Sequence, residues 1–151
     1  MVQLLTRRGQ TLALAESCTG GLIAHRVTNL PGSSNIFLVG VVAYSNAAKQ
    51  KFLGVRAGVL ARHGAVSEAV ARAMAEGARA RFGAYFALAV TGIAGPSGGT
   101  RVKPVGTVFI ALAGAPGTVV ECKLNSRGRR RFKEATARQA LELLRARLVQ
   151  D

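Results

Sequence analysis

Apolar residues along the chain fall into two patterns: short continuous runs, and longer stretches in which they recur every three or four positions. Continuous apolar runs of this length are typical of strands buried in a sheet, whereas the wider spacing is typical of helices that pack on one face. The runs that predict strands span residues 11–16, 37–45, 85–90, 105–113 and 118–124. The run at 37–45 is rich in β-branched residues and almost wholly apolar, which predicts a central strand covered on both faces.

Helical spacing follows several of these runs, so strands and helices alternate along most of the chain. The predicted helices span residues 22–30, 47–53, 56–62, 67–82 and 131–149. Ser67 is a good N-cap, and Gly54 and Gly83 are placed to end the helices before them.

This alternation predicts an α/β fold. We expect a three-layer α/β/α sandwich around a mixed, mainly parallel sheet of about five strands. The short turn at 114–117 predicts that the last two strands form a hairpin. No internal repeat or linker divides the sequence, so residues 1–151 are predicted to form a single domain.

The charge balance is strongly basic, with 21 Lys and Arg against 7 Asp and Glu and a formal net charge of +14. Such a surplus indicates either an anionic partner, nucleic acid or a phosphorylated small molecule, or a solvated surface rich in arginine. Most of the bases are arginines, and 2 Tyr and 6 Phe leave little for stacking against nucleobases. The composition therefore favours a solvated surface over nucleic-acid binding.

The scarcity of acidic residues argues against several kinds of active site. The only Asp is Asp151, the last residue, so a Ser-His-Asp triad or a magnesium site built from several Asp is not expected. His25 and His63 have no obvious ligand partners, and no metal centre is predicted. Cys18 and Cys122 stand in no zinc or CxxC spacing, which suits a reducing cytoplasm. No apolar run approaches the roughly 20 residues of a membrane span and no signal peptide is recognisable, so a cytoplasmic protein without membrane contact is expected.

Residues 16–21 (ESCTGG) join a predicted strand to a predicted helix. A serine at such a strand end faces the edge of the sheet, and the N–H groups that open the helix attract anions. Ser17 is therefore a candidate nucleophile, with the N–H groups of residues 19–21 available to hold an oxyanion. The same pattern fits a plain turn in which a side chain only caps the helix. The residues expected beside the substrate are Glu16, Thr19, Gly20 and Gly21.

A serine nucleophile needs a base, and a lysine can serve if burial lowers its pKa towards neutrality. Lys49 is the best placed, one turn into the helix that follows the strand ending near residue 45. It would lie at the same sheet edge as Ser17 if the two strands are parallel. Lys51 would point away from this edge. Cys18 is a rival nucleophile, although a free cysteine at this place is more often part of the core.

Residues 91–106 (TGIAGPSGGTRVKPVG) are too many and too rich in glycine for a simple connection. Glycines let the backbone approach a ligand, and Thr91, Gly92 and Gly95 are expected against the substrate. The spacing matches neither a Walker loop nor GxGxxG, so neither ATP nor a dinucleotide cofactor is predicted. A flexible lid and a plain loop are the alternatives. Arginines crowd before the last helix, where one of them could meet a substrate phosphate. Arg129 is the candidate for the substrate site, and which basic residue holds the phosphate is left open.

Together these segments resemble the C-terminal domain of the competence/damage-inducible CinA family, whose stand-alone form is a nicotinamide-nucleotide amidase. The matching stretches are LAESCTGGLIAHRVTNLPGSS, VVAYSNAAKQKFLGV, GAVSEAVARAMAEGAR and AVTGIAGPSGGTRVKPVGTVFIAL. They occur in the family's order and cover nearly the whole chain, which makes the resemblance far more specific than a single motif.

The resemblance implies a hydrolase, without metal or cofactor, that converts nicotinamide mononucleotide to nicotinate mononucleotide and ammonia in pyridine nucleotide salvage. It places the catalytic serine at Ser17 and the catalytic lysine at Lys49, with Tyr44 nearby in the site. The expected partner is the small nucleotide substrate, and association into a homo-oligomer is left open. The alternative is a catalytically weak nucleotide-binding or regulatory module linked to competence or DNA damage.

The sequence departs from the family pattern in two places. The family loop often reads GGTPxKPVG, whereas this chain has Arg101 and Val102 there. The family's GDR turn before the last helix has no acidic counterpart within residues 125–131. Both departures bear on phosphate affinity and substrate choice. The family's large N-terminal domain has no counterpart in this sequence, so no activity that belongs to that domain is assigned to it.

Overall fold

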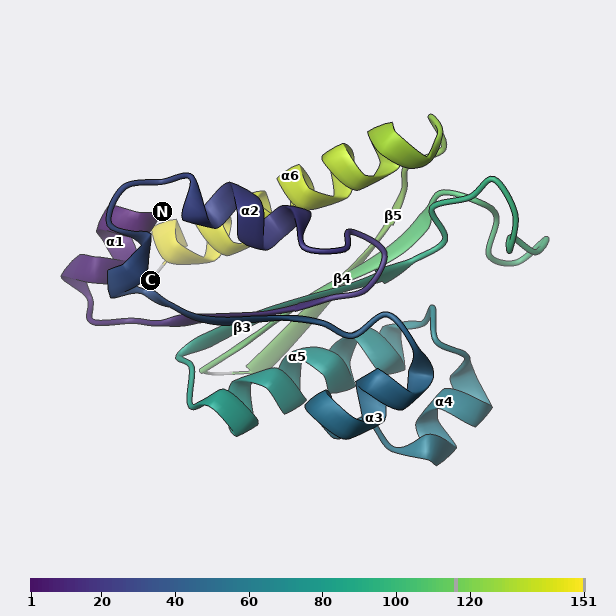
Figure 1. Cartoon of the computed structure of the whole chain (residues 1–151), viewed down its shortest axis with the longest axis horizontal. Coiled ribbons are helices and arrows are strands. Elements are labelled where there is room, and N and C mark those ends of the chain that lie inside the picture. The colour runs from purple at the N-terminus through teal and green to yellow at the C-terminus, as the bar shows by residue number, and fades with distance from the viewer. Residues whose placement is uncertain (116, 151) are drawn as a thin grey trace.

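The computed structural model, which describes residues 1–115 and 117–150, places a five-stranded sheet between two layers of helices (Figure 1). The strands are β1 (Leu12–Glu16), β2 (Phe37–Val42), β3 (Phe86–Gly92), β4 (Thr107–Gly114) and β5 (Gly117–Leu124). The helices are α1 (Val2–Arg7), α2 (Leu22–Thr28), α3 (Asn46–Leu53), α4 (Ala57–His63), α5 (Glu68–Phe82) and α6 (Arg129–Gln150), with a short 3-10 helix η1 (Ser33–Asn35).

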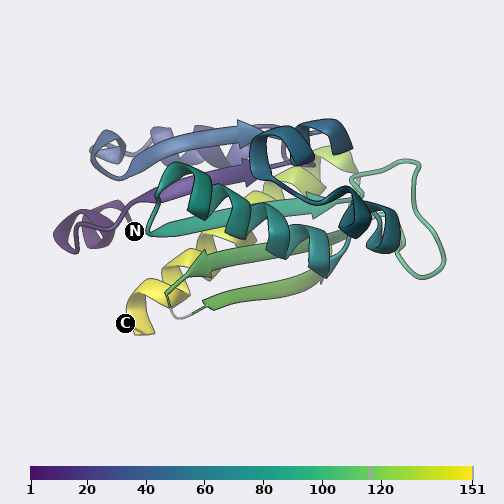
Figure 2. The same cartoon turned by 90° about the horizontal axis from the view of Figure 1, so that it is seen from below.

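The strands lie side by side in the order β2-β1-β3-β4-β5, as Figure 2 shows from below. β1 pairs in parallel with β2 and β3, whereas β4 pairs antiparallel with β3 and β5. The sheet is therefore mixed, as predicted, with only β4 running against the other strands. Because β1 and β2 are parallel neighbours, the segments that follow them meet at one edge of the sheet.

The two faces of the sheet differ in the size of their side chains. On β1, Leu12 and Leu14 belong to the core shared with α1, α2 and α6, whereas Ala13 and Ala15 belong to the core shared with α3, α4 and α5. Alternation of side chains along the strand sends these two sets to opposite faces. On the alanine face the helices also pack tightly on one another, since a Cβ added at Gly77 of α5 would overlap the backbone oxygen of Leu53 in α3. This packing fixes α3 on α5, which itself packs on the sheet.

The predicted strands and helices are all present, with ends shifted by a few residues. The turn at 114–117 includes residue 116, which lies outside the described residues, but β4 and β5 pair as the predicted hairpin. The helix α1 was not predicted, because it is short and lacks a side-chain cap; buried Leu5 anchors it.

The prediction that residues 37–45 form a central strand is wrong, because β2 is at the edge of the sheet. A continuous apolar run does not reveal on how many sides a strand is paired. Leu38 and Val42 of β2 are 51% and 49% exposed, and the wholly buried strands are β1 and, but for its last residue, β3.

Across residues 1–115 and 117–150, no helix combines the length and the apolar character required to cross a bilayer.

Candidate active site

Ser17 and Lys49 meet at the edge of the sheet where β1 and β2 end. Ser17 follows directly on β1, and its backbone N–H donates to the carbonyl of Val90 at 3.1 Å, which keeps the residue in register with β3. The amine Nζ of Lys49 in α3 lies 3.0 Å from Ser17 Oγ, although the two residues are 32 positions apart in the sequence. The parallel arrangement assumed from the sequence therefore brings together the two residues predicted to form the dyad.

The start of α3 aims Lys49 into the protein. Ser45 is the N-cap of this helix, and its hydroxyl accepts a hydrogen bond from the N–H of Ala48 at 3.1 Å. Lys49 then falls on the same buried face of α3 as Leu53, and it is only 1% exposed. Lys51, two positions on, is exposed, as predicted.

The amine of Lys49 is buried without an acidic partner among the described residues. Besides Ser17 Oγ, its contacts are the backbone oxygens of Ala43 at 3.0 Å and Tyr44 at 3.1 Å. Burial lowers the pKa of Lys49, because neutral acceptors only partly replace the water that stabilises an ammonium. A neutral amine fits the same three contacts by donating to both carbonyls and directing its lone pair at the hydroxyl of Ser17.

Glu16 is also buried, but its carboxylate bonds to the start of α2 and does not lie beside the substrate as predicted. One carboxylate oxygen accepts from the hydroxyl of Thr19 at 2.6 Å and from the N–H groups of Gly21 and Ile23 at 3.0 and 3.1 Å; the other accepts from the N–H of Ala24 at 2.8 Å. These donors include the N–H groups left free at the start of α2. Glu16 therefore caps α2 from the end of β1, the alternative that the sequence left open. Thr19, which is fully buried, supports that cap instead of facing a ligand.

The glycine turn after Ser17 also differs from the prediction. The N–H of Gly20 donates to the carbonyl of Ser17 at 3.1 Å, and that of Gly21 is held by Glu16. These two groups are therefore not free to hold an oxyanion. Among the described residues, the N–H groups of Cys18 and Thr19 donate to no other residue and are the remaining backbone candidates. Both glycines have positive φ, of 59° and 96°, so the turn needs them for its backbone conformation.

Cys18, the rival nucleophile, points into the leucine-rich core and is 5% exposed. Burial raises the pKa of its thiol to about 12. The thiolate is the reactive form of cysteine, so a thiol held neutral in this way is inert near neutral pH. The geometry therefore supports Ser17 over Cys18 as the nucleophile.

The glycine-rich loop is held in place by polar contacts. Lys103 donates from Nζ to the carbonyls of Val66 at 2.7 Å and His63 at 3.1 Å, which ties the loop to the segment before α5. Thr91 is buried and donates to the carbonyl of Ala65 at 2.8 Å. Gly92 lies within β3, where a Cβ would collide with the Thr107 backbone. The structure thus gives Thr91 and Gly92 packing roles instead of the predicted contact with a substrate.

Arg129, the first residue of α6, links the loop to the dyad. Its guanidinium donates to the carbonyl of Gly95 at 2.9 Å and to the hydroxyl of Tyr44 at 2.7 Å. Tyr44 is in turn the residue whose backbone oxygen accepts from Lys49. Gly95 and Arg129, predicted at the site, are thus connected to it through Tyr44.

Lys133 is a further cation at the site, and the sequence analysis did not select it. A Cβ added at Gly20 would lie 3.6 Å from Lys133 Nζ, so this ammonium lies beside the turn that follows Ser17. It stands one helical turn after Arg129 on α6, and this spacing of four is the signal that would have placed both on one face. A cavity of about 520 Å³ opens here, lined by Leu22, Arg129, Arg130, Lys133 and Glu134.

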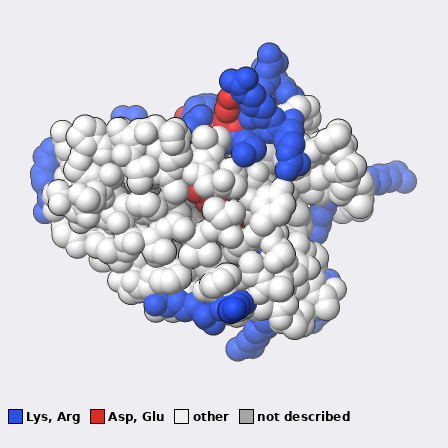
Figure 3. Space-filling view, in the orientation of Figure 1, with Lys and Arg blue, Asp and Glu red and all other residues white. Residues whose placement is uncertain are grey.

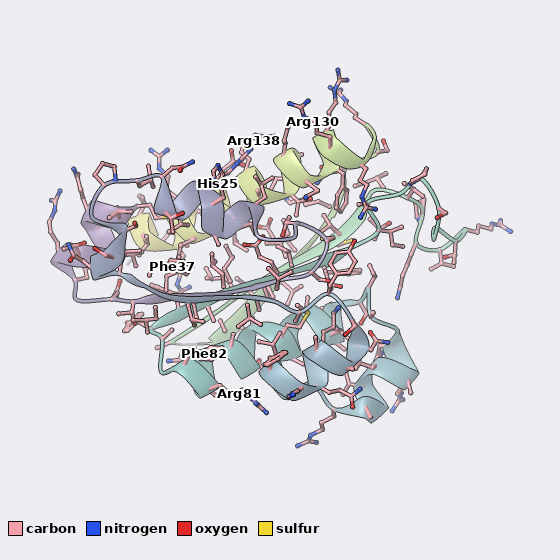
Figure 4. All side chains as sticks on the ribbon, viewed as in Figure 1. His25, Phe37, Arg81, Phe82, Arg130 and Arg138 are labelled. Carbon is pink, nitrogen blue, oxygen red and sulfur yellow. The ribbon has the colours of Figure 1, made fainter. Side chains whose placement is uncertain are left out.

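A larger hollow, of about 700 Å³, involves α6 further from the dyad. Its lining includes Arg26, Arg131 and Arg138 but neither Ser17 nor Lys49. Figure 4 shows Arg130 and Arg138 extending from the outer side of α6, away from the sheet. In the space-filling view, Lys and Arg gather over the N-terminal end of α6 (Figure 3).

Within the described part of the chain, no three His, Cys, Asp or Glu side chains come together as a metal site would require. The polar groups at the dyad are a hydroxyl, an amine, carbonyls and N–H groups, which suit proton transfer and the binding of anions.

Comparisons with known proteins agree with the segments noted in the sequence. A model of the CinA C-terminal domain matches residues 1–148. The CinA-like protein of Anaeromyxobacter sp. (strain Fw109-5) is 56% identical over 145 residues, which cover 96% of this chain and 35% of that protein. The CinA-like protein of Geobacter sulfurreducens is 53% identical over 149 residues, covering 99% of this chain and 36% of that protein. The chain therefore spans about a third of the length of these relatives.

Solved structures with the same fold support this assignment. The competence/damage-inducible protein CihA from Agrobacterium tumefaciens is 45% identical, with a TM-score of 0.92 over 96% of this chain and 89% of that one. A CinA superfamily protein from Klebsiella pneumoniae 700603 is 34% identical, with a TM-score of 0.94 over 99% and 93% of the two chains. By sequence and by fold, the chain belongs to the CinA C-terminal domain family.

Proposed function

We propose that the chain is an amidohydrolase that converts nicotinamide mononucleotide to nicotinate mononucleotide and ammonia by a Ser-Lys mechanism. The observation that carries this proposal is the 3.0 Å contact between Lys49 Nζ and Ser17 Oγ. The amine that makes it is buried, with no counter-ion among the residues that the structure describes. Burial lowers the pKa of Lys49, so the neutral amine that a general base requires forms at a lower pH than in an exposed lysine.

The reaction begins when Lys49 takes the hydroxyl proton of Ser17 as Oγ attacks the carboxamide carbon. The tetrahedral intermediate carries an oxyanion, for which the N–H groups of Cys18 and Thr19 are the donors nearest the nucleophile in the chain. Lys49 then gives its proton to the leaving nitrogen, and ammonia departs from the acyl-enzyme. Water attacks the ester, Lys49 accepts the proton of that water, and its return to Ser17 Oγ restores the enzyme.

The choice of a nucleotide as substrate rests on the family resemblance and on the cations beside the dyad. Arg129 and Lys133 line the 520 Å³ cavity, and Lys133 also lies beside the turn that follows Ser17. A phosphate bound there would be met by two positive charges. The names of the relatives and of the solved structures refer to CinA or to competence and damage and specify no reaction, so the substrate has to be tested directly.

The first experiment measures ammonia release from nicotinamide mononucleotide by the wild type, Ser17→Ala and Lys49→Ala, with Lys51→Ala as the matched control. We expect the wild type to turn over the substrate equally well with and without a chelator. Lys51→Ala should keep this activity, whereas Ser17→Ala and Lys49→Ala should lose it. Turnover that survives Ser17→Ala would overturn the mechanism. Nucleotide binding without turnover by the wild type would instead favour a binding module.

A second experiment tests the phosphate contact. Lys133→Met should raise KM for nicotinamide mononucleotide by about tenfold, the effect of losing one charge-assisted contact of about 1.4 kcal/mol. The same variant should leave the turnover of nicotinamide riboside, which has no phosphate, unchanged. An equal loss with both substrates would place Lys133 outside the phosphate site.

A further inference from the structure

The two edges of the sheet are protected very differently. The outer strand β5 carries Glu121 and Lys123, which pair at 3.0 Å, and the guanidinium of Arg72 donates to the Thr118 carbonyl at 2.7 Å. Charged side chains of this kind discourage a second strand from pairing with an edge. The opposite edge strand, β2, has the sequence FLVGVV and carries neither a charge nor a proline.

The uncharged character extends beyond β2 to a long segment of the sequence. Residues 27–48 contain no Lys, Arg, Asp or Glu, in a chain that has 28 of them in 151 positions (21 basic and 7 acidic). Several of the large apolar side chains exposed in the structure belong to this segment or follow it closely: Leu30, Leu38, Val42, Tyr44 and Phe52. β2 is nearest the viewer in Figure 1, and in the same orientation the space-filling view is mostly white in the middle, with Lys and Arg at the margins (Figure 3).

The backbone of β2 is also suited to accept another strand. The N–H of Ala43 donates to the Glu16 carbonyl at 2.8 Å, so at this residue the backbone faces β1. Backbone groups of successive residues in a strand face opposite sides. The N–H and C=O groups of Val42 and Gly40 are therefore directed outward, where no strand of the described chain pairs with them.

We propose that a second copy of this chain pairs with β2 through its own β2, antiparallel, about a two-fold axis at Gly40. Pairing about this residue sets Gly40 opposite its own copy and Leu38 opposite Val42, so apolar side chains meet in both halves of the contact. Two-fold interfaces require a patch that is complementary to itself, and this one is. Each copy carries a net charge of +14, so contact through the uncharged edge keeps the repulsive side chains apart.

This pairing bears on the candidate active site. Tyr44 stands two residues after Val42, at the end of the proposed contact; its hydroxyl accepts from Arg129 and its carbonyl accepts from Lys49. The second copy would therefore form a wall beside the site. That consequence rests on the proposed function, whereas the pairing itself does not.

The first test measures molar mass by sedimentation or light scattering, which does not depend on activity. The wild type should have twice the 15.7 kDa mass of one chain. Leu38→Lys should give the monomer mass, because it sets an ammonium group without a counter-ion against the apolar Val42 of each copy. Val119→Lys on β5, at a side chain that is 45% exposed, should remain dimeric. Circular dichroism would verify that both variants fold. A monomeric wild type, or a dimer that survives Leu38→Lys, would overturn the proposal.

A cysteine pair tests the register. In an antiparallel pair of hydrogen-bonded residues the Cα atoms are about 5.5 Å apart, a separation that a disulfide spans. Leu38→Cys combined with Val42→Cys, in a Cys122→Ser background, should oxidise to covalent dimers. A variant with only one of these two cysteines should not form covalent dimers, because each residue would lie four positions from its own copy along the ladder. Cross-linking by the single variants alone would show a different interface.

Discussion

Glu16 and Lys49 are both 1% exposed and lie on either side of Ser17, yet their surroundings differ in kind. The carboxylate of Glu16 accepts four hydrogen bonds, three of them from N–H groups of the turn and first residues of α2. The amine of Lys49 has only neutral oxygens around it, one of which belongs to the candidate nucleophile. Burial lowers the pKa of Lys49.

The difference shows how a buried charge can serve either the fold or the chemistry. The carboxylate of Glu16 satisfies four donors that would otherwise be buried without an acceptor, so Glu16 strengthens the turn that positions Ser17. An amine without a counter-ion is held closer to its neutral form, which adds little to stability but makes it a base. Substitutions on the two sides of Ser17 should therefore separate loss of stability from loss of activity.

The largest effect is expected for Lys49→Met. Amidase activity should fall by about four orders of magnitude, as when a member of a catalytic unit is removed. The free energy of unfolding should change by no more than about 1 kcal/mol, because two effects oppose each other. The variant gains stability because it no longer buries an amine, and it loses stability because two carbonyls are left without their donor. Kinetic assays and urea unfolding measure the two quantities. A large loss of stability would mean that Lys49 is structural.

Glu16→Gln should have the opposite profile. An amide cannot satisfy all four donors, so we expect the free energy of unfolding to fall by about 2–3 kcal/mol. The matched control is Glu121→Gln, which breaks the exposed pair with Lys123 and should cost at most about 0.5 kcal/mol. If Glu16→Gln unfolded at the same urea concentration as the wild type, the cap would not be stabilising α2.

The pH dependence should identify Lys49 as the base. Because the reaction requires the neutral amine, kcat/KM should rise about tenfold per pH unit below the pKa of Lys49. It should level off at a pH below the ordinary lysine pKa of 10.5. The folded-state pKa is lowered, so between that value and 10.5 the unfolded chain binds more protons and stability rises with pH. Lys49→Met should abolish this rise in stability. A rate that is flat with pH would argue against a lysine base.

The smallest effect is expected for Cys18→Ala. With a thiol pKa of about 12, Cys18 contributes no thiolate at neutral pH, so activity should stay within about threefold of the wild type. Mass spectrometry after brief treatment with iodoacetamide should find Cys122, which is exposed, modified before Cys18. An inactive Cys18→Ala protein with a normal fold would reopen the question of the nucleophile.

Much of the fold was predictable because local patterns control it. Apolar runs and helical spacing located the strands and the longer helices, and Ser67 and Gly83 marked the ends of α5 as expected. The edge position of β2 was not predictable, since its apolar run looks the same whether one or two strands pair with it. Only the order of strands, set by how all the helices pack, decided it.

The candidate site divides in the same way. By itself the sequence determined that Ser17 ends a strand before a helix, that Lys49 stands one turn into another helix, and that a triad with Asp is absent, because these features depend on neighbouring residues and composition. Only the tertiary structure decided that Lys49 Nζ reaches Ser17 Oγ, that Glu16 caps α2 and that Lys133 lies beside Gly20. Hydrogen bonds, burial and pKa depend on atoms brought together from distant parts of the chain, and no local pattern records them.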